Sequence, residues 1–311
     1  MDYPKVNVLV LSYNGKYLLD DCLSSYLGNH YPNFQVTVID NGSHDGTYDY
    51  VKEHFPKAEV IRIEKNAGYS GGFNAGLWHA FRDQKADFVL VSNNDVKADG
   101  DAISALVEVA QLDEKNGFVT GKVYYFDRPD ILQTVGKKDD PIRWNGGQIG
   151  RNEKDNGQYE QVMERPFADD IFTLVSRKLY EKTGGYDPTF FLQCEEYDWQ
   201  ARAKNAGFRI VYTPKAKLWH KVSMTIGKAS PLKAYYDTRN PMIVIMKYKS
   251  PDYFRRYFWL HVRSDVIKTS LRLILRTFEL KKVLKIWLGL FSGIYWGIRN
   301  KKLTLKHVIK Y

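Results

Sequence analysis

The chain has 311 residues, of which 44% are hydrophobic and 26% are charged, a composition typical of a folded globular protein. Its length suits one large α/β domain with an appendage, or two domains of ordinary size. The only cysteines are Cys22 and Cys194, which excludes a disulfide framework and fits a reducing compartment. No secretory signal pattern is visible at the start of the sequence, so we expect a cytoplasmic protein.

The net charge of +10 is concentrated towards the C-terminal end. Residues 231–311 hold 18 Lys and Arg against four Asp and Glu, whereas residues 1–230 hold 28 against 32. This asymmetry predicts a near-neutral domain over residues 1–230 and a basic extension over residues 231–311. A basic extension favours a polyanionic partner, either an anionic membrane surface or a nucleic acid.

Strand-like runs alternate with helical patterns over the first hundred residues. Each β-rich run is followed by a polar loop and then by apolar residues at helical spacing; the runs are residues 6–11, 36–39, 60–63 and 88–91. This alternation predicts an α/β fold with a doubly wound, mainly parallel, Rossmann-like sheet. Because ligands bind such sheets beyond the carboxyl ends of the strands, we expect the site in the loops that follow these four runs.

The second half of the domain is less regular. Residues 137–165 are polar and Gly-rich, which indicates a long loop or a small hairpin insertion. A strand, a short helix to Lys182, a helix from about 195 to 205, and two strands at 209–212 and 217–220 are expected after it.

The basic extension is helical and aromatic. Its most apolar window, residues 283–298, contains Lys285 and is shorter than the roughly 20 residues that cross a bilayer. We therefore expect its helices to lie in a membrane interface, with Trp259, Trp287 and Trp296 at headgroup depth. The alternative is a helical pair packed on the domain with a solvated basic face. No nucleic-acid partner is expected, because no recognised nucleic-acid motif accompanies the segment.

Two of the polar loops carry groups suited to a nucleotide. Asp40 ends a strand, where its carboxylate could accept the N3–H of a uracil or thymine ring. Residues 66–72 are expected to form a Gly-rich loop, followed by a helix through residues 75–81. The glycines of residues 66–76 would let the backbone approach a phosphate, although tight helix packing explains them equally well. The glycine spacing matches neither the dinucleotide fingerprint nor the P-loop.

The fourth loop reads Asn93-Asn94-Asp95 directly after a hydrophobic strand. One carboxylate and two amides make a poor cage alone, but a divalent ion keeps open positions for substrate phosphate oxygens. His220, at the end of a later strand, could join that ion as a neutral imidazole. An Asx turn or a helix cap is the structural alternative for the loop.

Acidic residues open the helix expected near 195. On a helix Glu195, Asp198 and Arg202 share one face, so Asp198 and Arg202 form an i, i+4 pair. Glu196 points about 100° away and is the freer carboxylate for a general base. Carboxylates in a first turn also favour the helix dipole, which is the structural alternative for each of them.

Taken in order, these segments resemble the family 2 glycosyltransferases, inverting enzymes of the GT-A fold, over about residues 5–245. By this resemblance Glu196 or Glu195 is the catalytic base, and Asp95 with His220 holds Mg²⁺ or Mn²⁺. The resemblance also implies a donor-nucleotide site made of Ser12, Asn14, Asp40, Asn66, Gly68, Asn74, Asn93 and Asn94. Asp198, Trp199 and Arg202 are then structural or acceptor-side residues.

The chain departs from the family pattern at two positions. Asn93 replaces the first acid of Asp-x-Asp, which resembles bacterial rhamnosyltransferases that use dTDP-rhamnose. Glu196 replaces the usual Asp of the acidic motif, so the choice between Glu195 and Glu196 stays open. The segment with Tyr235-Tyr236 and Arg239-Asn240 resembles one found beyond the core of bacterial rhamnosyl- and galactofuranosyltransferases.

The implied reaction is a single displacement in which a sugar leaves a dTDP- or UDP-linked donor for a glycan or polyprenyl-linked oligosaccharide. We expect L-rhamnose as the sugar and the inner face of the cell membrane as the place. A galactofuranosyl- or other hexosyltransferase is the alternative within the family. A non-catalytic protein that binds nucleotide sugars or glycans is the alternative from another class.

Overall fold

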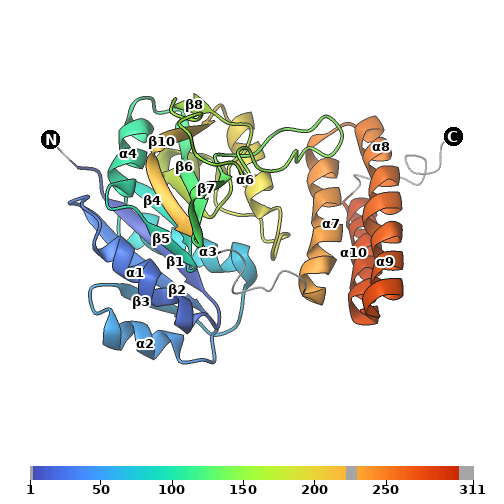
Figure 1. The fold of residues 1–311 in the computed structure, drawn as a ribbon, viewed down its shortest axis with the longest axis horizontal. Coiled ribbons are helices and arrows are strands. Elements are labelled where there is room, and N and C mark those ends of the chain that lie inside the picture. The colour runs from blue at the N-terminus through green and yellow to red at the C-terminus, as the bar shows by residue number, and fades with distance from the viewer. Residues whose placement is uncertain (1–2, 222–229, 301–311) are drawn as a thin grey trace.

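The computed structural model describes residues 3–221 and 230–300 of the chain. An α/β domain and a bundle of C-terminal helices lie side by side, and α7 is the bundle helix nearest the domain (Figure 1).

One ten-stranded sheet forms the centre of the α/β domain. Its strands are β1 (Val6–Ser12), β2 (Phe34–Asn41), β3 (Glu59–Ile63), β4 (Phe88–Asn93), β5 (Val96–Ala98), β6 (Asn116–Tyr125), β7 (Arg128–Thr134), β8 (Met163–Glu164), β9 (Phe172–Ser176) and β10 (Arg209–His220). Their order is β3-β2-β1-β4-β9-β6-β10-β5, with β7 paired to β6 and β8 to β10. The block β3-β2-β1-β4 is parallel, as is the β6-β10 pair, whereas β9 runs antiparallel to both of its neighbours.

This topology brings distant polar residues to one edge of the sheet. Ser12 pairs with Asp40 and Leu11 with Asn93, so the carboxyl ends of β1, β2 and β4 are level. Since β9 is antiparallel to β4, the start of β9 lies at this same edge, and residues 169 and 170 come just before it. The expected site therefore gains a second group of side chains from a segment far away in the sequence.

Helices cover both faces of the sheet, as the doubly wound prediction requires. They are α1 (Leu19–Leu27), α2 (Thr47–His54), α3 (Gly68–Trp78), α4 (Ala102–Gln111), α5 (Arg177–Thr183) and α6 (Glu195–Asn205). Side chains of α1, α2 and α4 pack with Val8 and Val10 on one face, while those of α3, α5 and α6 pack with Leu9 on the other. Alternate residues of β1 thus pack into the two hydrophobic cores, because successive side chains of a strand point to opposite faces of the sheet.

The glycine-rich segment predicted as a loop over residues 66–72 is instead mostly helical. Helix α3 begins at Gly68 and not near residue 75. A Cβ at Gly72 would lie 2.5 Å from Leu11 Cδ1, and one at Gly76 would lie 2.3 Å from Ile39 Cδ1. These glycines let the helix lie directly on the sheet, which corrects the loop prediction in favour of tight packing.

The two strands expected at 209–212 and 217–220 are one strand, β10, which pairs along β6 with a register shift between Tyr212 and Lys217. Pro214 lies in that interval and has no N–H to donate, which accounts for the irregular pairing.

The C-terminal bundle consists of α7 (Pro231–Tyr248), α8 (Pro251–His261), α9 (Thr269–Thr277) and α10 (Leu280–Arg299), with a wide helical turn at Val262–Lys268 between α8 and α9. Helices α7 and α10 approach closely at glycines, because a Cβ at Gly289 would lie 2.5 Å from Tyr235 O and one at Gly293 would lie 3.1 Å from the Met242 sulfur. Within the described residues, none of the helices has the length and apolar character needed to cross a bilayer. Trp287 and Trp296 pack against the core of the bundle, whereas Trp259 is 43% exposed.

Hydrogen bonds and ion pairs join the bundle to the segment that leads into α6 and to α6 itself. Asn240 Nδ2 donates to the carbonyls of Leu192 and Gln193 at 2.7 and 2.8 Å. Lys247 Nζ lies 2.7 Å from Asp187 Oδ2 and also contacts Asp198. The bundle therefore fixes the residues immediately before the acidic cluster.

Candidate active site

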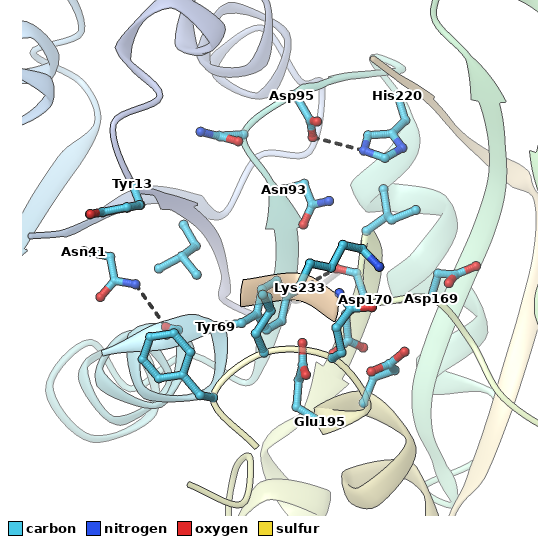
Figure 2. A pocket seen from close by; sticks show the side chains of 18 of the residues that line it. Tyr13, Asn41, Tyr69, Asn93, Asp95, Asp169, Asp170, Glu195, His220 and Lys233 are labelled. Carbon is cyan, nitrogen blue, oxygen red and sulfur yellow. Dashed lines mark hydrogen bonds and ion pairs between the residues drawn. The ribbon is translucent and has the colours of Figure 1, made fainter. Parts of the chain in front are cut away.

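A cavity of about 610 Å³ opens at the sheet edge where β1, β2 and β4 end. Its volume is in the range of sites that bind small molecules. Eight residues singled out from the sequence line it, namely Asn66, Gly68, Asn93, Asn94, Asp95, Glu195, Glu196 and His220. Figure 2 shows Asp95 and His220 together at one end of the view and Glu195 at the other.

Asp95 and His220 meet because β5 and β10 are antiparallel neighbours, with Val96 opposite His220. Asp95 Oδ1 lies 3.0 Å from His220 Nε2, and both side chains are buried. The other ring nitrogen of His220, Nδ1, lies 2.8 Å from the amide oxygen of Gln133. Gln133 was not found from the sequence, because the residue lies 87 positions from His220.

This pair fits a divalent cation. In a neutral imidazole, the amide oxygen of Gln133, which can only accept, places the ring proton on Nδ1, and the Nε2 lone pair then faces the carboxylate. Nε2 contacts Asp95 Oδ1 and has no other partner among the described residues. Two acceptor atoms 3.0 Å apart have the spacing of adjacent ligands around an octahedral ion with bonds of about 2.1 Å. Within the described part of the chain, no group of three or more His, Cys, Asp or Glu is arranged to hold a metal.

Ser12 and Asn14, neither of which lines the cavity, connect the end of β1 to the segments that follow β4 and β2. Ser12 is buried and accepts a hydrogen bond from Asn94 Nδ2 at 3.2 Å. The Asn14 side chain accepts from the His44 N–H at 2.8 Å, and its own N–H donates to Ser43 Oγ at 2.9 Å. These two residues hold the loops and thereby the position of Asn94.

Asn41, which the sequence did not single out, organises the opposite wall. Its Nδ2 donates to the Gly68 carbonyl at 3.0 Å and to Asn66 Oδ1 at 3.2 Å, and its Oδ1 accepts from the Ala67 N–H at 3.0 Å. Asn66 Oδ1 also accepts from the Gly68 N–H at 2.8 Å. The start of α3 is therefore fixed against the end of β2.

Asp40 and Asn74, both expected at the donor nucleotide, lie outside the cavity lining. Asp40 is fully buried, accepts from the Ser43 N–H at 3.0 Å and lies 3.6 Å from Arg62 Nε. Asn74 accepts from the Tyr186 N–H at 2.8 Å and donates to its carbonyl at 2.9 Å, which joins α3 to the loop after α5.

The acidic end of the cavity contains one buried lysine. Lys137 Nζ lies 2.7 Å from Glu196 Oε1 and 2.9 Å from Asp169 Oδ1, and its side chain is 9% exposed. Burial alone would lower the pKa of Lys137, but the charges of Asp169 and Glu196 outweigh it and hold that pKa well above its ordinary value. Lys137 is therefore a permanent cation between two carboxylates.

Two further carboxyl groups beside this lysine favour the protonated form. Burial, followed by the charge of Glu196, raises the pKa of Asp170 to about 8, and the Tyr186 hydroxyl donates to Asp170 at 2.7 Å. Burial and the charge of Glu196 also raise the pKa of Glu195 well above its ordinary value. Glu195 Oε2 is buried and has no hydrogen-bond partner within the described residues. The adjacent Glu196, by contrast, forms the ion pair with Lys137.

Asp198, Trp199 and Arg202 lie behind the cavity and hold α6. Arg202 Nε lies 2.9 Å from Asp198 Oδ2, which confirms the predicted pair, and Arg202 also donates to the carbonyls of Thr183 and Gly185. Trp199 is buried and its Nε1 donates to Thr183 Oγ1 at 3.0 Å. These contacts join α6 to the segment after α5.

Several residues that line the cavity were not predicted from the sequence. Asp169 and Asp170 could have been noticed as two consecutive acids directly before a β-rich run. Lys137 carried no such signal, since it belongs to the polar insertion and lies 59 residues from its partner Glu196.

The chain is similar to known proteins over much of its length. The family model described as Glycosyl transferase family 2 matches residues 7–202. Poly-beta-1,6-N-acetyl-D-glucosamine synthase from Staphylococcus epidermidis is 26% identical over 228 residues, and the Staphylococcus aureus enzyme of that name is 24% identical over 226. Each match covers 71% of this chain and 51% of the relative, so the chain spans about half the length of the curated relatives it matches.

Two solved structures share the fold. The mannosyltransferase PcManGT from Pyrobaculum calidifontis, in complex with GDP-Man and Mn²⁺, has a TM-score of 0.57 and 15% identity, over 96% of this chain and 88% of that one. Residues 1–349 of TarS from S. aureus have a TM-score of 0.56 and 16% identity, over 93% of this chain and 80% of that one. At these identities the likeness concerns the fold alone, and it confirms the expected GT-A architecture with a helical C-terminal region.

Proposed function

Because the chain belongs to the family 2 glycosyltransferases, we propose that it transfers a sugar from a nucleoside-diphosphate donor to a glycan acceptor with inversion at the anomeric carbon. The observation that carries this proposal is the cavity itself, in which the Asp95–His220 pair and the Glu196 carboxylate face the same space. A cation site for a diphosphate and a base for a hydroxyl are the two groups that such a transfer requires.

The donor occupies the end of the cavity that holds Asp95 and His220. Asn93 and Asn94 precede Asp95, and Asn66 lines the opposite wall; all three offer amide groups to the nucleotide and its phosphates. A bound Mg²⁺ or Mn²⁺ would neutralise the negative charge that develops on the departing diphosphate. The related fold of PcManGT was solved with Mn²⁺ and GDP-Man, which supports a divalent ion here.

Glu196 is the better candidate for the catalytic base. One of its oxygens lies 2.7 Å from Lys137 Nζ and forms an ion pair with it, and a carboxylate can accept a proton. The pKa of Glu195 is raised, which favours its protonated form, so Glu195 suits a hydrogen-bond donor to a sugar hydroxyl.

The step is a single displacement. Glu196 takes the proton of an acceptor hydroxyl, whose oxygen forms a bond to the anomeric carbon while the bond from that carbon to the diphosphate oxygen breaks. The electron pair of the broken bond leaves on the nucleoside diphosphate. One displacement inverts the anomeric configuration and requires no covalent sugar–enzyme intermediate.

L-Rhamnose from dTDP-rhamnose is the donor that we propose first. The support is Asn93, which stands where Asp-x-Asp carries its first acid and which lines the cavity. Galactofuranose and other hexoses donated by UDP are the alternatives. N-acetylglucosamine gains weight among them from the names of the curated relatives.

We further propose that residues 1–230 form the transferase domain and residues 231–311 a membrane-associating extension at the inner face of the cell membrane. Helices α9 and α10 support this, since Leu275, Phe278 and Leu284 are 75%, 78% and 60% exposed beside basic side chains such as Arg276 and Lys281. Apolar groups beside cations are the pattern of interfacial helices on anionic lipid. A polyprenyl-linked acceptor would be reached at that surface.

The testing experiment measures donor consumption and transfer by the full chain with Mg²⁺ or Mn²⁺. The donors are dTDP-rhamnose, UDP-galactofuranose, UDP-glucose and UDP-GlcNAc, each with a lipid-linked acceptor mixture. Metal-dependent consumption of one donor, lost in Glu196→Gln, would support the transferase and name its sugar. Binding of a donor without any turnover would favour the non-catalytic alternative.

A further inference from the structure

A second cavity, of about 420 Å³, lies between the middle of α7 and the last turns of α10. Its lining consists of Arg239 from α7 and of Ser292, Tyr295, Trp296, Arg299 and Asn300 from the end of α10. The two helices approach closely at Gly289 and Gly293, next to the first of these α10 residues. The cavity is therefore part of the packed bundle rather than a gap between mobile loops.

The chemistry of this cavity suits a phosphate. Among the described residues that line it, two are arginines and none is acidic. Arg239 Nη1 donates to the Thr189 carbonyl at 3.0 Å and to Asn240 Oδ1 at 2.7 Å, so its guanidinium is fixed in place. Its Nε is buried and lacks a hydrogen-bond partner within the described residues. A fixed guanidinium with an unused donor, beside a second arginine, is well matched to phosphate oxygens.

The hydroxyl of Ser292 adds another donor. Ser292 Oγ accepts a hydrogen bond from the Tyr235 hydroxyl at 2.8 Å, which leaves its own O–H available to donate.

An apolar face borders the cavity. Leu284, Leu288, Phe291, Tyr295 and Ile298 of α10 follow one another at intervals of four and three residues, and each is 44% to 63% exposed. This spacing places them on one side of the helix. Tyr295 belongs both to this face and to the lining of the cavity. A group held in the cavity would therefore lie next to whatever covers the apolar face.

Helix α7 connects this cavity to the active site. Lys233 lines the large cavity and Arg239 lines the second one, six residues further along the same helix. Six residues correspond to about 9 Å along a helix, roughly the length of one or two sugar rings. A phosphate near Arg239 is thus placed close enough for a glycan attached to it to reach the large cavity.

We propose that the second cavity binds the phosphate group of a membrane lipid while the apolar face of α10 enters the lipid. The headgroup of an anionic phospholipid and the diphosphate of a polyprenyl-linked acceptor present this same chemistry. The inference rests on the membrane association proposed above and is independent of which sugar is transferred.

The test compares binding of the full chain to vesicles of equal surface charge. Phosphatidylcholine vesicles carry either a fatty acid, phosphatidylglycerol or a polyprenyl diphosphate, and bound protein is measured by co-sedimentation. Non-specific attraction depends on surface charge and is equal in the three arms. We expect about tenfold tighter binding to at least one phosphate lipid than to the fatty-acid vesicles, and the preferred lipid identifies the source of the phosphate.

Arg299→Ala and Arg276→Ala provide the matched pair of variants, since both arginines are exposed in the last turn of a bundle helix and each change removes one charge. Arg299→Ala should abolish the preference for phosphate lipids over the fatty acid. Arg276→Ala should weaken binding to all three kinds of vesicle alike and leave this preference unchanged. Arg239→Lys, which retains the charge but loses the guanidinium fork, should also reduce the preference.

Equal binding in the three arms, or equal effects of the two alanine variants on the preference, would overturn the phosphate site. Failure to bind any vesicle would overturn the membrane association as well. Donor consumption measured without lipid reports separately on the transferase, so the failure of one proposal is distinguishable from that of the other.

Discussion

Lys137 Nζ lies 2.7 Å from Glu196 Oε1 and 2.9 Å from Asp169 Oδ1. The lysine comes from the polar insertion, the glutamate from the first turn of α6 and the aspartate from the segment before β9. Three separate parts of the chain therefore meet at the proposed catalytic base.

Glu196→Gln should lower the rate of sugar transfer by about 10²- to 10⁴-fold, because the amide cannot take the proton of the acceptor hydroxyl. Glu195→Gln should cost less than about tenfold, since an amide can still donate the hydrogen bond assigned to protonated Glu195. Transfer rates of the two variants, measured at saturating donor, check this. The opposite ranking would assign the base to Glu195.

Lys137→Met should lower the rate of sugar transfer by about tenfold or more, because it removes the cation that lies 2.7 Å from Glu196 and 2.9 Å from Asp169. Lys137→Arg keeps the charge and should restore most of the rate. Transfer rates at saturating donor measure this, with melting temperatures as the check that both variants fold. Equal losses of rate in the two variants would contradict a role for the positive charge.

Asp170→Asn should stabilise the protein at neutral and mildly alkaline pH. The pKa of Asp170 is about 8 in the folded protein, against an ordinary value of 3.8, so between these values the folded state keeps a proton that the unfolded state has released. The free energy of unfolding of the wild type therefore falls as pH rises through this window, by up to about 1.4 kcal/mol per pH unit, and levels off above it.

Melting temperatures of Asp170→Asn and wild type at several pH values from 5 to 8 would check this. The difference in melting temperature should grow with pH and reach its maximum near pH 8. The exposed Asp127→Asn serves as the control and should leave the pH dependence unchanged. A difference that stays constant with pH would show that Asp170 is ionised throughout.

Gln133→Leu should weaken binding of Mn²⁺ by about 10- to 100-fold, because the ring of His220 would lose the acceptor that fixes its Nδ1 proton. The measurement is the free Mn²⁺ signal in electron paramagnetic resonance, which does not depend on turnover. Gln148→Leu is the matched control, since Gln148 also lines the cavity but donates to Asp169 at 3.2 Å. Equal affinities of the two variants for Mn²⁺ would show that Gln133 has no role in binding the ion.

Phe291→Glu should reduce binding to anionic vesicles by about tenfold or more, because it places a charge in the middle of the apolar face of α10. Leu112→Glu is the control, since Leu112 is 71% exposed after α4, outside the bundle. Co-sedimentation with phosphatidylglycerol vesicles measures both. If the two variants bind the vesicles equally well, the apolar face of α10 does not contact the lipid.

Local patterns predicted much of the fold. The alternation of β-rich runs and helical spacing predicted the doubly wound sheet, and the helix over residues 195–205 is present with those bounds as α6. The loop predicted at residues 66–72 was wrong, because the glycines of this segment let α3 pack directly on Leu11 and Ile39. A glycine that permits a turn and a glycine that permits close packing look alike in a sequence, because the difference lies in the neighbour that occupies the missing Cβ position.

For the site, the sequence determined which residue types lie at the ends of strands and at the start of α6, since these follow from short-range periodicity. It therefore supplied Asp95, Glu195, Glu196 and His220. Only the tertiary structure decided the state of these groups. Gln133 orients His220 from 87 residues away and Lys137 faces Glu196 from 59 residues away. Protonation and tautomer depend on burial and on charges within a few ångströms, and such proximity arises from chain topology, which no local pattern encodes.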